Sequence, residues 1–244
     1  GGDMTPDSPV VSTRTLAAVA LPASGQPFTS VTSDAVTVTW ASGTAAIGFN
    51  GPGASYKVQA STAADFSGTL YSDAPTTDLD MTLSLSPNAT YYFRVQSYNA
   101  GGYTDYSWLV LGSTATQIET PSGINFTAVS ATSIDLLVQG QPAFTKLDAG
   151  QSSIAKAING VYAAWFNSTA DSYPGLTPNT QYTFSAKARN LEGRVTPEVN
   201  VSTWTLAMTP APAAQAFGNV FTGTLWTYWQ ANGNPGGTEY RAEV

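Results

Sequence analysis

The chain has 244 residues, 42% of them hydrophobic and 10% charged, with a formal net charge of -7. That length suffices for about two ordinary domains, and the negative charge argues against nucleic acids and anionic membranes as partners, because both recruit basic surfaces. The sequence contains no Cys and no His, which excludes disulfides and thiolate metal sites and removes the commonest general base and metal ligand.

The N-terminal part offers no membrane segment. The apolar stretch LAAVALPA at 16–23 is far shorter than the roughly 20 residues of a membrane span, and Pro22 interrupts it. The first residues also lack the charged start and the cleavage site of a signal peptide. We therefore predict no membrane span, and we expect that, if the protein is secreted, this sequence is a mature or trimmed piece.

The first clear strand signal is VTVTW at 36–40, where Val36, Val38 and Trp40 face one way and the two Thr face the other. The same alternation recurs twice further along the chain, although a polar Thr interrupts the last copy. The matching positions are Ile134, Leu136 and Val138, and then Leu225, Thr227 and Trp229. We predict three copies of one half-buried strand.

A longer segment occurs twice. LSPNATYYFRVQSYNAGG at 85–102 returns as LTPNTQYTFSAKARNLEG at 176–193, displaced by 91 positions. In the first copy Tyr91, Phe93 and Val95 share one face, and turn residues follow, so we predict a strand and a turn. A repeat of this length is typical of one structural unit copied in tandem.

A hairpin is predicted shortly before the second copy. INGVYAAW at 158–165 favours it, because Asn-Gly suits a type I′ turn and apolar residues flank it. A short helix at 152–158 is the alternative. Short strands, close turn signals and the long repeat together indicate an all-β chain of tandem antiparallel sandwiches.

The repeated residues resemble the strand E to strand G signature of fibronectin type III domains, of the kind found in bacterial-type extracellular repeat arrays. In the first copy the matching residues are Leu85, Pro87, Asn88, Tyr91, Phe93, Val95, Asn99 and Gly101. In the second copy they are Leu176, Pro178, Asn179, Tyr182, Phe184, Ala186, Asn190 and Gly193. The resemblance implies immunoglobulin-like β-sandwiches.

The resemblance also assigns structural roles. It implies that Tyr91 and Tyr182 are tyrosine corners, whose hydroxyls bond to upstream backbone, and that Trp40 and Trp229 are core residues. The second domain departs from the pattern, because Val138 stands where the core Trp is expected. We expect Trp165 from the predicted hairpin to fill that core instead.

Aligning the repeats divides the chain. Residues 1–16 are predicted to be the final strand of a preceding sandwich, because VSTRTLAAVALPA at 11–23 matches VSTWTLAMTPAPA at 201–213. Two fibronectin type III-like domains are predicted to follow, at 17–116 and 117–206.

Residues 207–244 are predicted to be the first strands of an incomplete third domain, with GNPGGTEYRAEV at 233–244 as its third strand. So short a segment buries too little core alone, and its open edge needs cover. Either the chain is a window on a longer array, or neighbouring chains complete it through β-strand addition. Trp226 and Tyr228 point outward and form a candidate interface or sugar platform.

Candidate chemistry is sparse. Asp78 and Asp80, with Asp73 nearby, are the oxygen ligands that calcium prefers, but no acidic cluster of binding-loop spacing surrounds them. The Ser and Thr residues have no His to activate them, and the Lys residues lie in no recognisable motif. We predict that the chain is not an enzyme and has no catalytic, cofactor-binding or metal site.

We therefore expect a non-catalytic structural protein, extracellular or on the cell surface, that acts as a serial β-sandwich spacer, stalk or fibre segment. One alternative is a self-assembling filament subunit, and another is a carbohydrate- or protein-binding adhesion module. The expected partners are neighbouring copies of the chain or adjacent repeats, and cell-surface glycans or proteins for the adhesion alternative. The fold does not choose between these roles.

Overall fold

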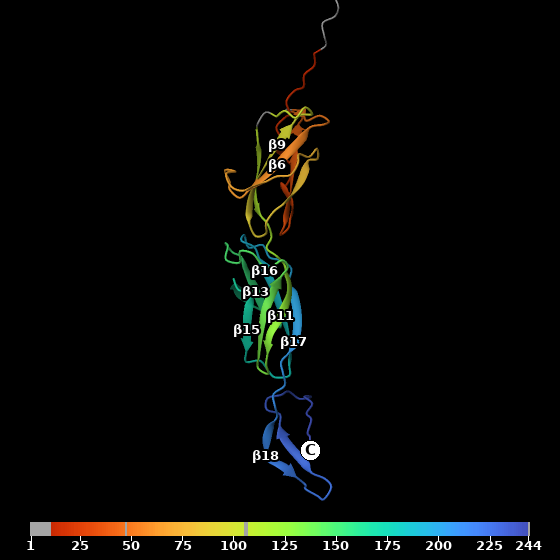
Figure 1. Cartoon of the computed structure of the whole chain (residues 1–244), viewed down its shortest axis with the longest axis vertical. Helices are drawn as coiled ribbons and strands as arrows, with labels where there is room; N and C mark the ends of the chain where they lie inside the picture. Colours follow the sequence, from red (N-terminus) through yellow and green to blue (C-terminus); the bar gives the residue numbers. More distant parts are fainter. Residues whose placement is uncertain (1–10, 47, 105–106, 244) are drawn as a thin grey trace, which may run out of the picture. The chain divides into compact units, whose positions relative to one another are not determined.

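The structure is a computed structural model that describes residues 11–46, 48–104 and 107–243. All of the regular secondary structure in these residues is β-strand. The chain divides after Thr116 into two compact units (Figure 1). The all-β prediction is therefore confirmed. The finer division into four segments stays a prediction. Most of the predicted first strand, residues 1–10, lies outside the described residues, and 11–16 are exposed and form no strand.

The first unit is a sandwich of two antiparallel sheets. One sheet has the order β1-β3-β2 with β8 on the other side of β3, and the other has the order β10-β9-β6-β7. A small hairpin, β4-β5, lies apart from both sheets. The strands are β1 (Leu21–Pro22), β2 (Phe28–Val31), β3 (Ala35–Ala41), β4 (Gly43–Thr44), β5 (Gly48–Phe49), β6 (Ser55–Ser61), β7 (Leu70–Tyr71), β8 (Asp80–Ser84), β9 (Thr90–Tyr98) and β10 (Leu109–Ala115).

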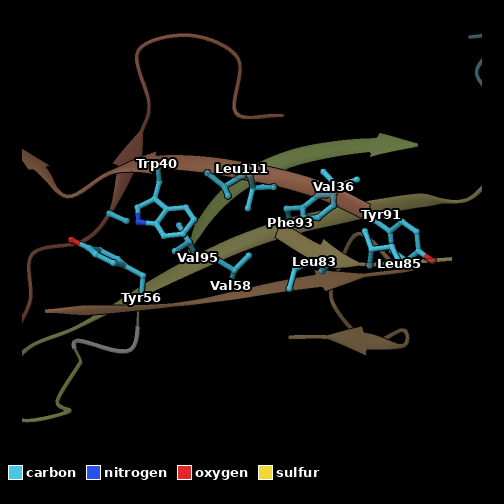
Figure 2. Packing of buried hydrophobic residues seen from close by; sticks show 13 residues of the cluster. Val36, Trp40, Tyr56, Val58, Leu83, Leu85, Tyr91, Phe93, Val95 and Leu111 are labelled. Atoms are coloured by element: carbon cyan, nitrogen blue, oxygen red, sulfur yellow. The ribbon is translucent and has the colours of Figure 1, made fainter. Parts of the chain in front are cut away.

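Alternation along the strands builds the core of this sandwich. Val36, Val38 and Trp40 are buried on β3 while their neighbours are partly exposed, as predicted from VTVTW. Figure 2 shows Trp40 facing Tyr56 across the sandwich, with the apolar residues of β6 and β9 beside them; the two ring centroids lie 5.5 Å apart. Phe93 of β9 is fully buried, so both sheets contribute to one core.

The second unit contains a similar sandwich. Its sheets have the orders β11-β12-β15 and β14-β13-β16-β17. The strands are β11 (Pro121–Val129), β12 (Ser133–Gly140), β13 (Ser153–Ile158), β14 (Val161–Phe166), β15 (Ala170–Pro174), β16 (Gln181–Arg189) and β17 (Val199–Trp204). The hairpin prediction is confirmed and the helix alternative is wrong, because Asn159 and Gly160 both have positive φ and join β13 to β14.

The prediction that Trp165 fills the second core is wrong. Trp165 pairs with Ala155 and lies under the guanidinium of Arg189, whose carbon is 4.6 Å from the ring centroid. The core is instead built around Phe184, and Phe144 and Leu147 from the loop after β12 pack against it. A loop thus supplies the volume that a Trp supplies in the first sandwich.

The segment after β17 forms only a hairpin of β18 (Ala211–Gly218) and β19 (Trp226–Gln230). The third strand predicted at 233–244 is not formed, because residues 231–243 make turns and non-strand backbone. We call residues 207–243 the terminal segment. Its sheet has no second sheet facing it among the described residues.

Candidate interaction surface

The terminal segment exposes the face that the first sandwich buries. Phe217 lies opposite Thr227 on the hairpin, as Phe28 lies opposite Val38 in the first sandwich. On this inward face Trp229 is 41% exposed, whereas its counterpart Trp40 is 2% exposed. The predicted core role of Trp229 is therefore wrong for this structure, because two strands cannot enclose a side chain that needs a second sheet.

Trp229 still keeps one neighbour that the repeat prescribes. Its ring centroid lies 5.9 Å from that of Tyr240 at an interplanar angle of 55°, and the Trp40–Tyr56 pair has the same angle at 5.5 Å. The terminal segment therefore reproduces the start of a sandwich core in local geometry and lacks only its cover.

The opposite, outward face of the hairpin carries the predicted platform. Trp226 is 56% exposed and Tyr228 is 43% exposed. Tyr228 lies against Gly218, where an added Cβ would come within 2.8 Å of its ring. The two exposed aromatics alternate onto one face of β19, an arrangement suited to a protein surface or a sugar ring.

A turn with a similar pattern of hydrogen bonds accompanies each of these Trp–Tyr pairs. Asn234 accepts a hydrogen bond from the Met208 N–H (2.7 Å) and donates to the Met208 carbonyl (2.8 Å). Asn50 does the same with Ala18, at 2.7 and 3.0 Å. Each turn closes with a backbone bond, Ala54 N–H to Gly51 in the first and Thr238 N–H to Pro235 in the second. We call residues 50–54 and 234–238 the asparagine turns.

The two corner tyrosines bond to the backbone five residues upstream. The Tyr91 hydroxyl accepts from the Ser86 N–H at 3.1 Å, and the Tyr182 hydroxyl accepts from the Thr177 N–H at 2.9 Å. Burial raises the pKa of Tyr91 above its ordinary value. These hydroxyls pin the loops 86–91 and 177–182, which we call the corner loops.

A buried threonine holds the same corner loop from the other side, and sequence reasoning missed it. The Thr116 hydroxyl donates to the Ser86 carbonyl (2.9 Å) and accepts from the Ala89 N–H (3.1 Å). Thr205 makes the equivalent bonds to Thr177 (2.7 Å) and Thr180 (3.0 Å). We call these the exit threonines. The shared Ser-Thr-x-Thr pattern at 113–116 and 202–205 was the available signal.

Several titratable groups form ion pairs and aromatic contacts within single sandwiches. Lys156 is 2% exposed, donates to the Ser168 and Ala170 carbonyls at 2.9 and 2.6 Å, and lies 3.7 Å from Asp171. Burial lowers its pKa, and Asp171 opposes that shift. The buried amine is thus fully engaged with backbone carbonyls, which favours a structural role over that of a nucleophile.

Outer sheet faces carry aromatics stacked on cations. The Arg94 guanidinium lies between Phe66 and Trp108, 4.1 and 4.2 Å from the ring centroids. Lys187 lies 4.0 Å from the Tyr162 ring centroid, and the Tyr162 hydroxyl donates to Glu198. Burial, with the Glu198 contact second, raises the pKa of Tyr162 to about 12. Cations occupy these rings, which leaves them less free to stack on a sugar.

The remaining exposed groups are scattered. Trp204 is 55% exposed at the end of β17. Asp73, Asp78 and Asp80 are exposed, and no group of three or more His, Cys, Asp or Glu gathers as a metal site within the described ranges. Residues 11–46, 48–104 and 107–243 also include no helix long and apolar enough to cross a membrane.

The family model of the fibronectin type III domain matches residues 22–111. A two-domain fibronectin type III segment of chicken tenascin has a similar structure, with a TM-score of 0.54, 12% identity, and coverage of 77% of this chain and 100% of that chain. No curated protein sequence matches the chain.

Two further solved structures are less similar. The chicken interferon gamma receptor alpha chain has a TM-score of 0.45 at 15% identity, covering 78% of this chain and 99% of that one. The central fibronectin III array of RIM-binding protein has a TM-score of 0.29 at 14% identity, covering 89% and 73%. Residues 22–111 therefore match the fibronectin type III family model, and the structure has the fold of tandem fibronectin type III β-sandwiches.

Proposed function

We propose that the chain is a non-catalytic structural segment, in which serial β-sandwiches act as a spacer, stalk or fibre outside the cell or on its surface. Fibronectin type III domains occur in structural, adhesion and receptor proteins, commonly extracellular ones, and their fold is generally non-enzymatic. The proposal selects the structural role among these.

The observation that carries the proposal is the double anchoring of each sandwich's last strand. At Ser86 and at Thr177, a tyrosine hydroxyl holds the N–H and an exit threonine holds the carbonyl. The next strand begins soon afterwards, at Pro121 after Thr116 and at Ala211 after Thr205. A short, anchored connection suits a molecule that sets distance or transmits force, whereas a long polar linker would decouple the domains.

A filament subunit is the second candidate, and the inward face of the terminal segment favours it. Phe217, Leu225 and Trp229 are 57%, 47% and 41% exposed on that hairpin. A neighbouring chain that covers this face would bury them. Each fully buried side chain would stabilise the assembly by about 1.5–3 kcal/mol. β-Strand addition to the open hairpin edge supplies backbone hydrogen bonds as well.

Light scattering over a wide concentration range separates the two candidates. We expect a spacer segment to keep the mass of the 25.4 kDa monomer at all concentrations. A mass that grows without limit identifies a filament subunit, and deletion of residues 1–16 should then disperse the polymer if strand donation holds it together. Polymers that persist after that deletion would contradict strand donation.

The adhesion alternative predicts that glycan binding depends on the two outward aromatics. Replacing Trp226 and Tyr228 by Ser should abolish binding to a glycan array while leaving the mass unchanged, since both residues lie on the outward face. Saturable binding of the unmodified chain that is lost in this variant would replace the structural proposal.

A further inference from the structure

The N-terminal end of the first sandwich is hollowed. An open cavity of about 840 Å³ lies there, lined among others by Thr15, Leu16, Asn50, Gly51, Asn99 and Ala100. The backbone of residues 15–18 is held in place although it forms no strand. Asn99 Nδ2 donates to the Thr15 carbonyl at 2.7 Å, and Asn50 pairs with the backbone of Ala18 at 2.7 and 3.0 Å.

The second asparagine turn shows what such a turn contacts. Within the second unit, Asn179 Nδ2 donates to Thr238 Oγ1 at 2.9 Å. Asn179 belongs to a corner loop and has a φ of 45°, the left-handed conformation that Asn tolerates better than most residues. A corner loop is therefore seated on the asparagine turn that follows it in the chain.

Residues 11–16 complete the pattern. Their sequence VSTRTL matches VSTWTL at 201–206, so Thr15 stands in the position of the exit threonines Thr116 and Thr205. Those two are 0% and 2% exposed because each is docked on a corner loop. Thr15 lies in an exposed stretch.

We propose that this cavity is the docking site for the corner loop of a preceding sandwich of the same type. The Thr15 hydroxyl binds a carbonyl and an N–H of that loop, and the loop's Pro-Asn turn sits against the asparagine turn at 50–54. Ala54 stands where the terminal segment has Thr238, so the incoming Asn donates to a backbone carbonyl here. The inference rests on the proposed serial function and names its upstream partner.

The lining also argues for this occupant over a charged ligand. Arg14 is the one charged residue among those that line the cavity in the described part of the chain, and the rest are small, apolar or amide side chains. The Asn50 and Asn99 amides hold the backbone of the cavity wall, and the Thr15 hydroxyl and exposed backbone groups suit a neutral, hydrogen-bonding loop. An anionic ligand instead requires several cations or oriented N–H groups.

An extended chain tests the proposal. Residues 117–200 are placed directly before residue 11, so that VSTRT takes the place of VSTWT behind a copy of the second sandwich. We expect amide hydrogen exchange in residues 11–18 and 48–54 to slow by about tenfold or more relative to the 11–244 chain, because docking restrains both segments. The matched control combines Thr15→Val with Asn→Gly at the added corner loop, since Gly keeps the positive φ.

The outcomes decide the matter. Unchanged exchange at both segments, or slowing that survives in the control, overturns the proposal. So does failure of the added sandwich to unfold as a cooperative unit in calorimetry, because the register at residue 11 would then be wrong. In the unextended chain, Asn179→Gly should speed amide hydrogen exchange at 234–238. Unchanged exchange in those residues would also count against the docking proposal. The mass measurement above is independent of all these results.

Discussion

Trp40 and Trp229 occupy equivalent positions in two copies of one pattern, and each packs against a Tyr ring with an asparagine turn nearby. Trp40 is nevertheless 2% exposed and Trp229 41% exposed. The difference lies in what faces them. Four strands face β3 in the first sandwich, and no second sheet faces β19 among the described residues. Local geometry is therefore a property of the strand and its turn, while burial is a property of the second sheet.

The two sandwiches differ in a second way. The first fills its core with a Trp–Tyr pair between strands, whereas the second has Val138 at the Trp position and draws Phe144 and Leu147 from a loop. Cores tolerate such changes if the total volume is kept. The corner tyrosines and exit threonines do not change between the two, because they hold backbone groups in fixed positions.

The largest effect on unfolding free energy should come from replacing Trp40, and the contrast with Trp229 tests the comparison. Trp40→Ala should destabilise the first sandwich by about 3–5 kcal/mol, because it removes a fully buried aromatic ring. Trp229→Ala should change the unfolding free energy by less than about 1 kcal/mol, as expected of an exposed side chain. Urea denaturation measures both. A large cost for Trp229→Ala would mean that the inward face is covered in solution.

The corner tyrosines should show a smaller effect. Tyr91→Phe and Tyr182→Phe should each cost about 1–3 kcal/mol, because the Ser86 or Thr177 N–H loses its partner. Tyr91→Phe should cost more, since Tyr91 is 1% exposed. Tyr92→Phe, a partly exposed neighbour on β9, is the control. Identical melting curves for the two corner variants and the parent chain would remove the corner assignment.

A pH-dependent effect should follow at Tyr162. Its pKa is raised from 10 to about 12, so the neutral phenol is favoured in the folded state. The stability it contributes is complete below pH 10 and is lost as the pH rises from about 10 to about 12. Tyr162→Phe should flatten the decline of the urea midpoint over this range. Parallel curves for the variant and the parent chain would contradict the prediction.

The smallest effect on stability should come from the outward face. Replacing Trp226 and Tyr228 together by Ser should leave the unfolding of both sandwiches within about 0.5 kcal/mol of the parent chain, because both side chains are exposed. Denaturation monitored by circular dichroism checks this. A larger loss would show that the platform packs against a sandwich.

Part of the candidate surface could be predicted from the sequence. The outward exposure of Trp226 and Tyr228 follows from strand alternation, which the backbone imposes locally. The docking of Thr116 and Thr205 could not be derived in the same way, because their partners lie 25 to 30 positions away and no periodicity links them. The repeat of Ser-Thr-x-Thr marked the positions but not the contacts.

The sequence by itself determined the repeated strands of the two sandwiches, the Asn-Gly hairpin, the tandem repeat and the positions of Tyr91 and Tyr182, because each depends on backbone preferences or on residues close in the chain. Only the tertiary structure decided the outward placement of Trp165, the exposure of Trp229 and the loop that fills the second core. Those outcomes depend on which surfaces meet across a sandwich, and contacts between distant segments are set by packing of the whole sandwich rather than by any local pattern.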